Sequence, residues 1–576
     1  MAVPRRWASA TAKKSKIYDA VVIGAGINGL VASAYLARAG LKVAIAERRS
    51  IVGGTAVTEE VVPGYRFSRG VDVVGLLRPQ IIADMNLENR GVKFLKRNPF
   101  SLTPLLDGSR YLMLGQDVDF NETQIAQYSR KDAEAYKDFL RRMTRLVHAV
   151  SPVVDSAPVD FFSGGFHAPL AMRDKVDSLL SASKFAFRLS ALGSQSVNLY
   201  ELFTAPLSRI LKREFETEPL CTAIARPALV ASMTAPSMPG TGALLLRHML
   251  GGENNNNRGQ WSFVEGGVGK LSQAVAEAAT EFGSELMLSQ SVSKLLVDDG
   301  KAVGVKLENG DELRSSTVVS SVDPWRTFVD LCPEDSLPDD FVRNIKSLDY
   351  SSGVFKLNVA LKGLPSLKAI PRKDSDVRPE HKCTLYLGAD CLEDMDHAFY
   401  DASVNVRPSS RPLLVVTIPS AMDPSLAPPG HAVAGIIVQH APYSLPWSNE
   451  SFKEQYVNKI FSGIEDYMPG FKELVVGYEA LSPHDIERVF GVHHGNMNHC
   501  ALTVDQLYYL RPAKQFSRYR SPLSQLYICG SGTHPGGGAS GAPGRNCAQI
   551  MLQDIKGRSE GEALQRGLQS FESPKK

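Results

Sequence analysis

The sequence predicts an α/β protein of two domains, one built on a parallel sheet and the other an α+β domain with a mixed sheet. Three observations support this prediction. A strand, a glycine-rich turn, a helix and a second strand follow one another at residues 19–54. Apolar strands beside glycine-rich turns return at 264–324 and at 526–541. The chain has 576 residues, 43% of them hydrophobic, and is long enough for two or more domains and a large core.

The first of these stretches has the pattern of a dinucleotide-binding unit. Residues 20–23 are apolar and β-branched, which is typical of a buried parallel strand. Residues 30–38 are expected to form a helix, and residues 41–46 a second strand. The turn before the helix is a Gly-x-Gly-x-x-Gly motif made by Gly24, Gly26 and Gly29. Because strand, turn, helix and second strand occur in register, the pattern indicates a Rossmann-type site.

Each residue of this motif has a physical reason. Gly24 allows the tight turn, and Gly26 lets the backbone approach a pyrophosphate because no Cβ intervenes. Gly29 lets the helix pack closely on the strand. The helix N-terminus offers unpaired N–H groups and a positive dipole end to phosphates. Glu47, at the end of the second strand, can accept hydrogen bonds from both ribose hydroxyls, and its charge disfavours a 2′-phosphate.

A glycine pair six residues beyond the acid indicates which dinucleotide binds. The spacing Glu-x5-Gly-Gly, from Glu47 to Gly53 and Gly54, resembles the N-terminal motif of FAD-containing amine oxidases and carotenoid desaturases. These enzymes usually have a basic residue after the pair, where this chain has Thr55. The resemblance favours FAD over NAD. It implies a first set of FAD-binding residues: Gly24, Ala25, Gly26, Asn28, Gly29, Glu47, Arg48, Gly53, Gly54 and Thr55.

The middle of the chain contains a second block that resembles this family. A Gly-Gly turn, a helix, a strand, a hairpin at Asn309-Gly310 and an apolar strand ending in Asp-Pro follow in order over 264–324. This order is similar to the second FAD-domain segment of phytoene-desaturase-type enzymes. In that family, a valine at the position of Val292 holds the adenine end through its backbone.

A third block closes the predicted cofactor domain. An apolar strand at 526–529 precedes a segment that resembles the Gly-x-Gly-Thr-His-Pro-Gly-x-Gly signature of bacterial carotenoid desaturases and their vertebrate relatives. The glycines at 536, 538 and 541 formally repeat Gly-x-Gly-x-x-Gly, but prolines flank them and no strand-ending acid follows, so we predict no second dinucleotide site. The resemblance implies that the flavin ribityl chain and pyrophosphate are held by Gly530, Gly532, Thr533, His534, Pro535 and Gly536.

The chain is therefore identified as a member of the carotenoid/retinoid oxidoreductase family. The fold class that follows is α/β, with an FAD-binding Rossmann-type domain like that of amine oxidases and phytoene desaturases, and an α+β substrate domain with a mixed sheet. The predicted parts are a targeting segment (1–16), three FAD-domain segments (17–120, 256–344 and 505–560), the helical part (121–255) and sheet (345–504) of the substrate domain, and a disordered tail (561–576).

A histidine cluster allows two interpretations. His493, His494 and His499, with Asp485 or Glu487, contain residue types that bind metals. Their spacing lacks the Cys partners or the HExxH register of zinc motifs, and we predict no metal. His499 is instead the candidate catalytic acid or base, because a neutral imidazole suits proton transfer.

Composition excludes several classes of function. The net charge is +3 and no basic stripe is interleaved with aromatics, so no nucleic-acid partner is expected. No apolar run is long enough to span a bilayer. The seven cysteines include no Cys-x-x-Cys, which argues for a reducing compartment, against structural zinc and against a redox-active dithiol.

Two basic segments bear on location. Residues 1–16 hold five lysines or arginines and no acid, a composition typical of mitochondrial targeting, which predicts a matrix protein with contact to the inner membrane as an option. A merely basic tail is the alternative.

Residues 179–192 interleave leucines with Lys184 and Arg188. Such a stretch could rest on a membrane surface, but we interpret it as a helix that covers its own domain's core.

These observations predict an FAD-dependent oxidoreductase that oxidises or desaturates a small apolar or amine substrate. The first alternative is a weakly catalytic flavoprotein that regulates mitochondrial function through a protein partner. A second alternative, an NADH-dependent disulfide reductase, would need another nucleotide site and a thiol pair, and the sequence pattern supplies neither.

Overall fold

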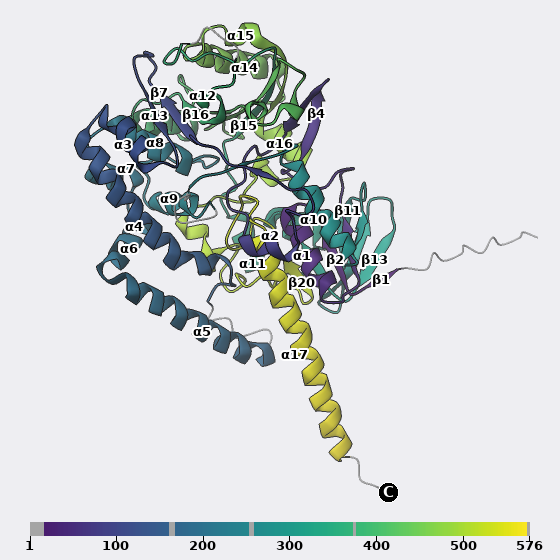
Figure 1. Cartoon of the computed structure of the whole chain (residues 1–576). Coiled ribbons are helices and arrows are strands. Elements are labelled where there is room, and N and C mark those ends of the chain that lie inside the picture. The colour runs from purple at the N-terminus through teal and green to yellow at the C-terminus, as the bar shows by residue number, and fades with distance from the viewer. Residues whose placement is uncertain (1–15, 160–167, 253–258, 372–375, 573–576) are drawn as a thin grey trace, which may run out of the picture.

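The computed structural model describes residues 16–159, 168–252, 259–371 and 376–572. A five-stranded parallel sheet organises one half of the molecule (Figure 1). Its strands come from three distant parts of the chain and pair in register with one another. In spatial order they are β10 (Glu285–Met287), β3 (Val43–Ala46), β2 (Ala20–Ile23), β14 (Val318–Ser320) and β20 (Leu526–Ile528).

Both faces of this sheet are covered, as the continuous apolar strands require. Helices α1 (Ile27–Arg38), α10 (Gly269–Glu281) and α17 (Ala542–Glu572) pack on one face, around Val22 and Ala20. Val21 and Ile23 face the other way, toward a four-stranded sheet. That sheet has the order β1 (Ile17–Tyr18), β13 (Glu312–Ser315), β12 (Lys301–Leu307) and β11 (Val292–Asp298).

A seven-stranded mixed sheet organises the other half, as the sequence predicted. One neighbouring pair is parallel and the others are antiparallel. Helix α14 (Glu450–Glu465) packs on it through a common apolar core. The spatial order is β19 (Val475–Leu481), β15 (Phe355–Leu361), β18 (Ala432–Val438), β17 (Leu414–Thr417), β16 (Thr384–Leu387), β7 (Ser101–Pro104) and β8 (Tyr111–Leu114).

Strands β7 and β8 differ from the prediction. They fall within the predicted cofactor segment 17–120, yet they extend the seven-stranded sheet at its edge. The physical reason is pairing: β7 runs parallel to β16 with Leu102 opposite Leu385, and both side chains enter the same core. The first segment therefore crosses into the substrate domain before the helical part begins.

A helical layer packs beside the mixed sheet and lies to its left in Figure 1. Ser129 caps the longest of its well-packed helices by accepting a hydrogen bond from the Asp132 N–H. The apolar side of this helix is buried at Phe139, Met143 and Val147. The layer consists of α3 (Val118–Ala126), α4 (Arg130–Val154), α6 (Ser196–Thr204), α7 (Leu207–Glu214), α8 (Glu218–Ala228) and α9 (Gly242–Met249).

Helix α5 (Ala168–Leu192) does not cover the core along its length, and this part of the prediction is wrong. It leans away from the body in Figure 1. Leu189 and Leu192, at its end, pack against the helical core. Leu179 is 62% exposed and Phe187 75% exposed, because no neighbouring element reaches this face within the described residues.

The two ends of the chain were predicted to be a targeting segment and a disordered tail. Helix α17 continues to Glu572 and projects from the body (Figure 1), so the predicted disordered tail over 561–576 is helical up to that residue. The sequence there is rich in Glu, Ala, Leu, Gln and Arg, which are strong helix formers. The predicted targeting segment lies outside the described residues except for Lys16.

Candidate flavin site and substrate cavity

One cavity of about 900 Å³ is lined by both large sheets and by the helical layer. Its volume is at the upper end of the range of roughly 300–1,000 Å³ that is usual for ligand sites. The carboxyl ends of β2 and β3 open into it, where a doubly wound sheet binds its ligand. Strands β16, β17 and β18 supply another part of the wall.

The glycine-rich turn is shaped to receive a group against its backbone. A Cβ added to Gly26 would meet no atom within 4 Å, and the backbone there (φ −68°) accepts any residue. The protein alone therefore does not require a glycine at this position. A Cβ on Gly29 would lie 2.2 Å from the Gly24 carbonyl oxygen, so this glycine serves helix packing. The free space at Gly26 opens onto the cavity, at the N-terminus of α1. This is the cradle that a pyrophosphate would fill.

The glycine pair returns to the same place. The Gly53 N–H donates to the Ala25 carbonyl oxygen at 2.8 Å, and Gly53 forms a parallel bridge with Gly26. Gly54 approaches the Cα of Gly26, since a Cβ on Gly54 would lie 3.3 Å from it. The turn and the glycine pair thus form two adjacent walls of the cavity, as their spacing predicted.

Glu47 is held rigidly at the end of β3. The side chain is 6% exposed and lines the cavity. One carboxylate oxygen accepts from the Ala25 N–H at 2.7 Å and the other from the Arg49 N–H at 2.8 Å. Each oxygen keeps a second lone pair, so the carboxylate can still accept from two ribose hydroxyls.

An unpaired amide oxygen also points to a ligand. Asn28 lines the cavity, and its Nδ2 donates to Ser531 Oγ at 3.4 Å, joining the first and third cofactor segments. Its Oδ1 is buried and has no partner within the described residues. A buried acceptor without a donor is costly, so a bound group with hydroxyls fits this position.

The structure brings most of the predicted binding residues together. Ala25 and Gly29 lie just behind the wall, where they support it. Val292 pairs with Leu307, which precedes Glu308, and the charge of Glu308 acts on Arg48. The predicted residues that line the cavity are Gly24, Gly26, Asn28, Glu47, Arg48, Gly53, Gly54, Thr55, Val292 and His499.

The third segment lies differently from its prediction. Within 530–541 the cavity is lined by Ser531, Gly538 and Ala539. His534 Nε2 instead contacts the Val153 carbonyl oxygen of α4 at 2.8 Å. The residues that stand behind the wall are Gly530, Gly532, Thr533, His534, Pro535 and Gly536. The signature therefore shapes the turn and docks it on α4, while its neighbours face the ligand.

Comparison with known proteins identifies the family of the chain. Residues 27–552 match the family described as flavin containing amine oxidoreductase. The chain belongs to this family. It is 44% identical to pyridine nucleotide-disulfide oxidoreductase domain-containing protein 2 of Rattus norvegicus, over 94% of each chain. It is 27% identical to a lycopene-forming phytoene desaturase of Pseudescherichia vulneris, over 93% of this chain and 99% of that protein.

Solved structures show the same fold. An oxidoreductase from Methanosarcina mazei superimposes with a TM-score of 0.57 at 17% identity, over 93% of this chain and 99% of the other. The family membership, the fold class and the prediction of a flavin-dependent oxidoreductase are thereby confirmed. The family is described as flavin-containing, and the glycine-rich end of the cavity is the candidate flavin site of this chain.

The candidate catalytic histidine is buried beside this flavin site. His499 packs on the third segment, and a Cβ on Gly530 would lie 3.0 Å from its Nδ1. That Nδ1 has no hydrogen-bond partner within the described residues. Burial, and then the charge of Arg511, lower the pKa of His499 to about 3. The imidazole is therefore neutral at physiological pH and poorly matched to accept a proton, which makes a hydrogen-bonding role more suitable.

The other two histidines of the cluster are engaged by aromatic rings. His493 stacks on Trp325 with ring centroids 4.3 Å apart, and His494 stacks on Tyr443 at the same separation. Glu487 accepts a hydrogen bond from the Tyr443 hydroxyl at 2.6 Å. In the part of the chain that the structure describes, no group of three potential ligands is arranged to hold a metal ion.

The far wall of the cavity was not identified from the sequence. It is apolar and comes mainly from three helices of the helical layer. The corresponding periodicity is that of any core-facing helix, so it carried no signal of a ligand site. The main apolar lining residues are Tyr136, Phe139 and Leu140 of α4, Ala223, Ile224 and Ala228 of α8, and Leu245 and Met249 of α9.

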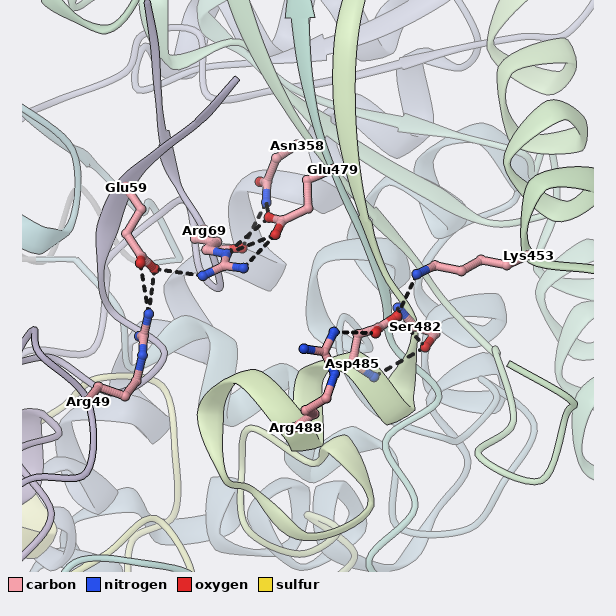
Figure 2. A network of polar contacts seen from close by, with 9 residues as sticks. All are labelled: Arg49, Glu59, Arg69, Asn358, Lys453, Glu479, Ser482, Asp485 and Arg488. Atoms are coloured by element: carbon pink, nitrogen blue, oxygen red, sulfur yellow. Dashed lines mark hydrogen bonds and ion pairs between the residues drawn. The ribbon is translucent and has the colours of Figure 1, made fainter. Parts of the chain in front are cut away.

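A network of polar side chains connects the half of the molecule that contains the parallel sheet to the mixed sheet (Figure 2). Arg49, which lines the cavity, pairs with Glu59 at 2.7 Å. Arg69 pairs with Glu59 at 3.1 Å and with Glu479 of β19 at 2.6 Å. Asn358 of β15 completes the network by donating to Glu479 at 3.0 Å. Glu59 lies on the β4 (Thr58–Val62) and β5 (Tyr65–Ser68) hairpin, which thus connects the two halves.

Two cysteines distant in sequence meet beneath the glycine-rich turn. Cys529 and Cys547 are fully buried and in hydrogen-bonding contact. The sequence pattern did not indicate this contact, because the two cysteines form no Cys-x-x-Cys motif. Burial, and then the contact with Cys529, raise the pKa of the Cys547 thiol well above its usual value. A protonated, buried thiol is inert toward disulfides, so the pair gives no support to disulfide reduction.

Proposed function

We propose that the protein is a mitochondrial oxidoreductase that uses FAD to oxidise or desaturate a small apolar or amine substrate. The observation that carries the proposal is a continuous cavity that joins the glycine-rich turn to the apolar wall of α4, α8 and α9. FAD supplies the acceptor for a hydride or its equivalent. The name of the phytoene desaturase relative supports desaturation of a carbon chain as one form of this reaction.

The protein's own residues perform three tasks in this proposal. The α1 N-terminus and Gly26 hold the pyrophosphate, and Glu47 holds a ribose. The apolar wall excludes water and orients the carbon chain. Ser531 and Asn28 fix the third segment against the first, so the flavin site is assembled only when both are in place.

Two measurements test the proposal. Mass spectrometry of the supernatant from denatured protein should find FAD in near-stoichiometric amount; NAD alone or FMN would contradict it. An anaerobic screen should then find a polyene, retinoid, acyl chain or amine that bleaches the flavin absorbance. Yellow protein that no candidate reduces would favour the alternative of a weakly catalytic flavoprotein with a protein partner. Rapid reduction by NADH would favour the disulfide reductase.

The proposed location includes contact with the inner membrane. The basic, acid-free composition of residues 1–16 supports import into the matrix. The exposed apolar side chains of α5, with Lys184 and Arg188 near them, support binding to an anionic lipid surface. None of the helices in the described residues has the length and apolar composition that a bilayer span needs. Removal of residues 1–16 should leave the protein cytosolic in cells; mitochondrial import of the shortened chain would contradict this.

A further inference from the structure

Two arginines, the buried Arg97 and the half-buried Arg247, line the cavity without an acidic partner. Arg97 is 5% exposed, its Nε donates to the Trp261 carbonyl oxygen at 2.7 Å, and its Nη1 contacts Thr384 Oγ1. Arg247 of α9 donates through Nη2 to the Gly537 carbonyl oxygen at 2.8 Å. Within the described residues, neither guanidinium forms an ion pair, and each keeps N–H groups without a partner.

The positive charges of Arg97 and Arg247 both act on His248, which lines the cavity. His248 follows Arg247 in α9, lines the cavity and stacks on Trp261 with ring centroids 5.7 Å apart. Burial, and then the charges of Arg247 and Arg97, lower the pKa of His248 to about 4. The imidazole is therefore neutral at physiological pH, whereas both guanidinium groups remain charged. Two cations thus face one region of the wall.

The nearby acid does not neutralise them. Asp72 also lines the cavity, and its charge acts on Arg97. Its Oδ2, however, is in contact with the Nζ of Lys356, which is buried in the mixed sheet. The Asp72–Lys356 pair is neutral as a whole, so the positive charge of Arg97 and Arg247 is uncompensated. A buried charge without a counter-ion is strongly unfavourable, and an anionic ligand removes this cost.

We propose that the substrate is an apolar molecule with a carboxylate, such as a medium- or long-chain carboxylic acid, whose anionic end is bound by Arg97 with Arg247 beside it. This inference rests on the proposed function, because it names the substrate class of the same cavity. The planar fork of a guanidinium matches the two oxygens of a carboxylate. The apolar wall of α4, α8 and α9 receives the chain. An ammonium group is repelled, which separates this protein's substrate from a simple amine.

The direct test compares three probes of equal chain length on the flavin-loaded protein. Decanoate, decan-1-ol and decylamine are titrated calorimetrically and, in parallel, by their effect on the flavin absorption bands. We expect decanoate to bind about tenfold or more tightly than decan-1-ol, and decylamine to bind most weakly. Equal affinities, or tighter binding of decylamine, would overturn the proposal without any variant being made.

Variants of Arg97 locate the effect. Arg97→Gln should remove the preference for decanoate and leave decan-1-ol affinity and flavin content unchanged, while the matched Arg97→Lys should keep part of the preference. Loss of flavin from Arg97→Gln alone would show that the arginine serves the cofactor's own phosphates, and would overturn the assignment. If the parent protein holds no flavin, the proposed function fails, and the calorimetric preference still decides the inference about the anion.

Discussion

The glycine-rich end of the cavity and its apolar end differ in which part of the chain would bind the ligand. At the first, backbone N–H groups, a missing Cβ at Gly26 and one fixed carboxylate form the wall. At the second, the wall consists of side chains from three helices and one sheet. A backbone site depends on a few glycines at fixed spacing, whereas a side-chain site can be built from many residue combinations. The glycine-rich end can therefore be recognised in the sequence as a motif, whereas the apolar end cannot.

The largest effect should come from the backbone end. Gly26→Val should abolish flavin binding, because its side chain occupies the cradle, and the melting temperature should fall to that of the flavin-free protein. Since a Cβ there meets no protein atom within 4 Å, the far-UV circular dichroism should not change. Gly29→Val is the contrast: its Cβ would lie 2.2 Å from the Gly24 carbonyl oxygen, so the fold itself should suffer. Full flavin content in Gly26→Val would disprove the assignment.

At the side-chain end, the buried Asp72–Lys356 ion pair should affect the stability of the fold. Lys356→Met leaves Asp72 buried without a partner and should reduce the free energy of unfolding by about 3–5 kcal/mol. The double variant Asp72→Leu, Lys356→Met removes both charges and should lose less than the single variant. Urea unfolding monitored by circular dichroism measures both. A double variant that is less stable than Lys356→Met would show that the two charges are not coupled.

Glu47 tests whether the carboxylate or only its hydrogen bonds matter. Glu47→Ala leaves two buried N–H groups unpaired and should weaken flavin binding by about 1–3 kcal/mol. Glu47→Gln keeps one acceptor and should lose less, as measured by flavin release during dilution. Equal losses in the two variants would mean that the negative charge is the whole effect.

The network at α16 (Pro483–Phe490) should give a pH-dependent effect. Burial alone would raise the pKa of Asp485, but hydrogen bonds from Lys453, Arg488 and Ser482 outweigh it and lower the pKa to about 2 (Figure 2). A depressed pKa contributes stability above the usual value of 3.8, and this contribution is lost as pH falls toward 2. Asp485→Asn should therefore be less stable than the parent at pH 7, and the difference should shrink in acid. A difference that stays constant with pH would exclude the charge as its origin.

The smallest effect on stability is expected at α5. Changing the exposed Leu179, Leu180 and Phe187 together to Ser should alter the free energy of unfolding by only a few tenths of a kcal/mol per site. Binding to vesicles of anionic lipid, measured by sedimentation, should be lost. Changing the buried Leu146, Val147 and Phe139 of α4 to Ser is the control, and it should destabilise the fold strongly. Unchanged vesicle binding of the α5 variant would remove this helix from the membrane proposal.

The sequence was informative where a residue type is required by local geometry. Gly29 and Gly53 were identified because a side chain at either position would collide with the backbone, Gly26 because a bound group needs the space of its missing side chain, and Glu47 because it ends a strand. The signature around His534 was recognised by its resemblance, which does not tell which of its residues line the cavity; in the structure Ser531, Gly538 and Ala539 do so. Arg97 lies between two short strands with no motif around it, and only the fold shows that it is buried in a cavity.

Secondary structure was predicted well where periodicity was strong and less well at the edges of domains. The boundary of the first cofactor segment was drawn at residue 120, beyond β7 and β8, because a strand pattern does not indicate which sheet the strand joins. Helix α5 has the amphipathic pattern of a core helix, yet much of its apolar side lies in the open. The pattern alone cannot distinguish a helix that faces a core from one that faces a partner or a lipid.

The strand order of the parallel sheet also sets an order of events during synthesis. Strand β20 (Leu526–Ile528) pairs with β14, and the segment after it carries Ser531, Gly538 and Ala539 of the cavity wall. These residues leave the ribosome long after the glycine-rich turn has emerged. The cavity thus stays open on one side until this third segment has been synthesised, and α1 is covered by α17 only after that. A nascent chain that stalls before residue 526 has all of the first motif and cannot enclose a flavin.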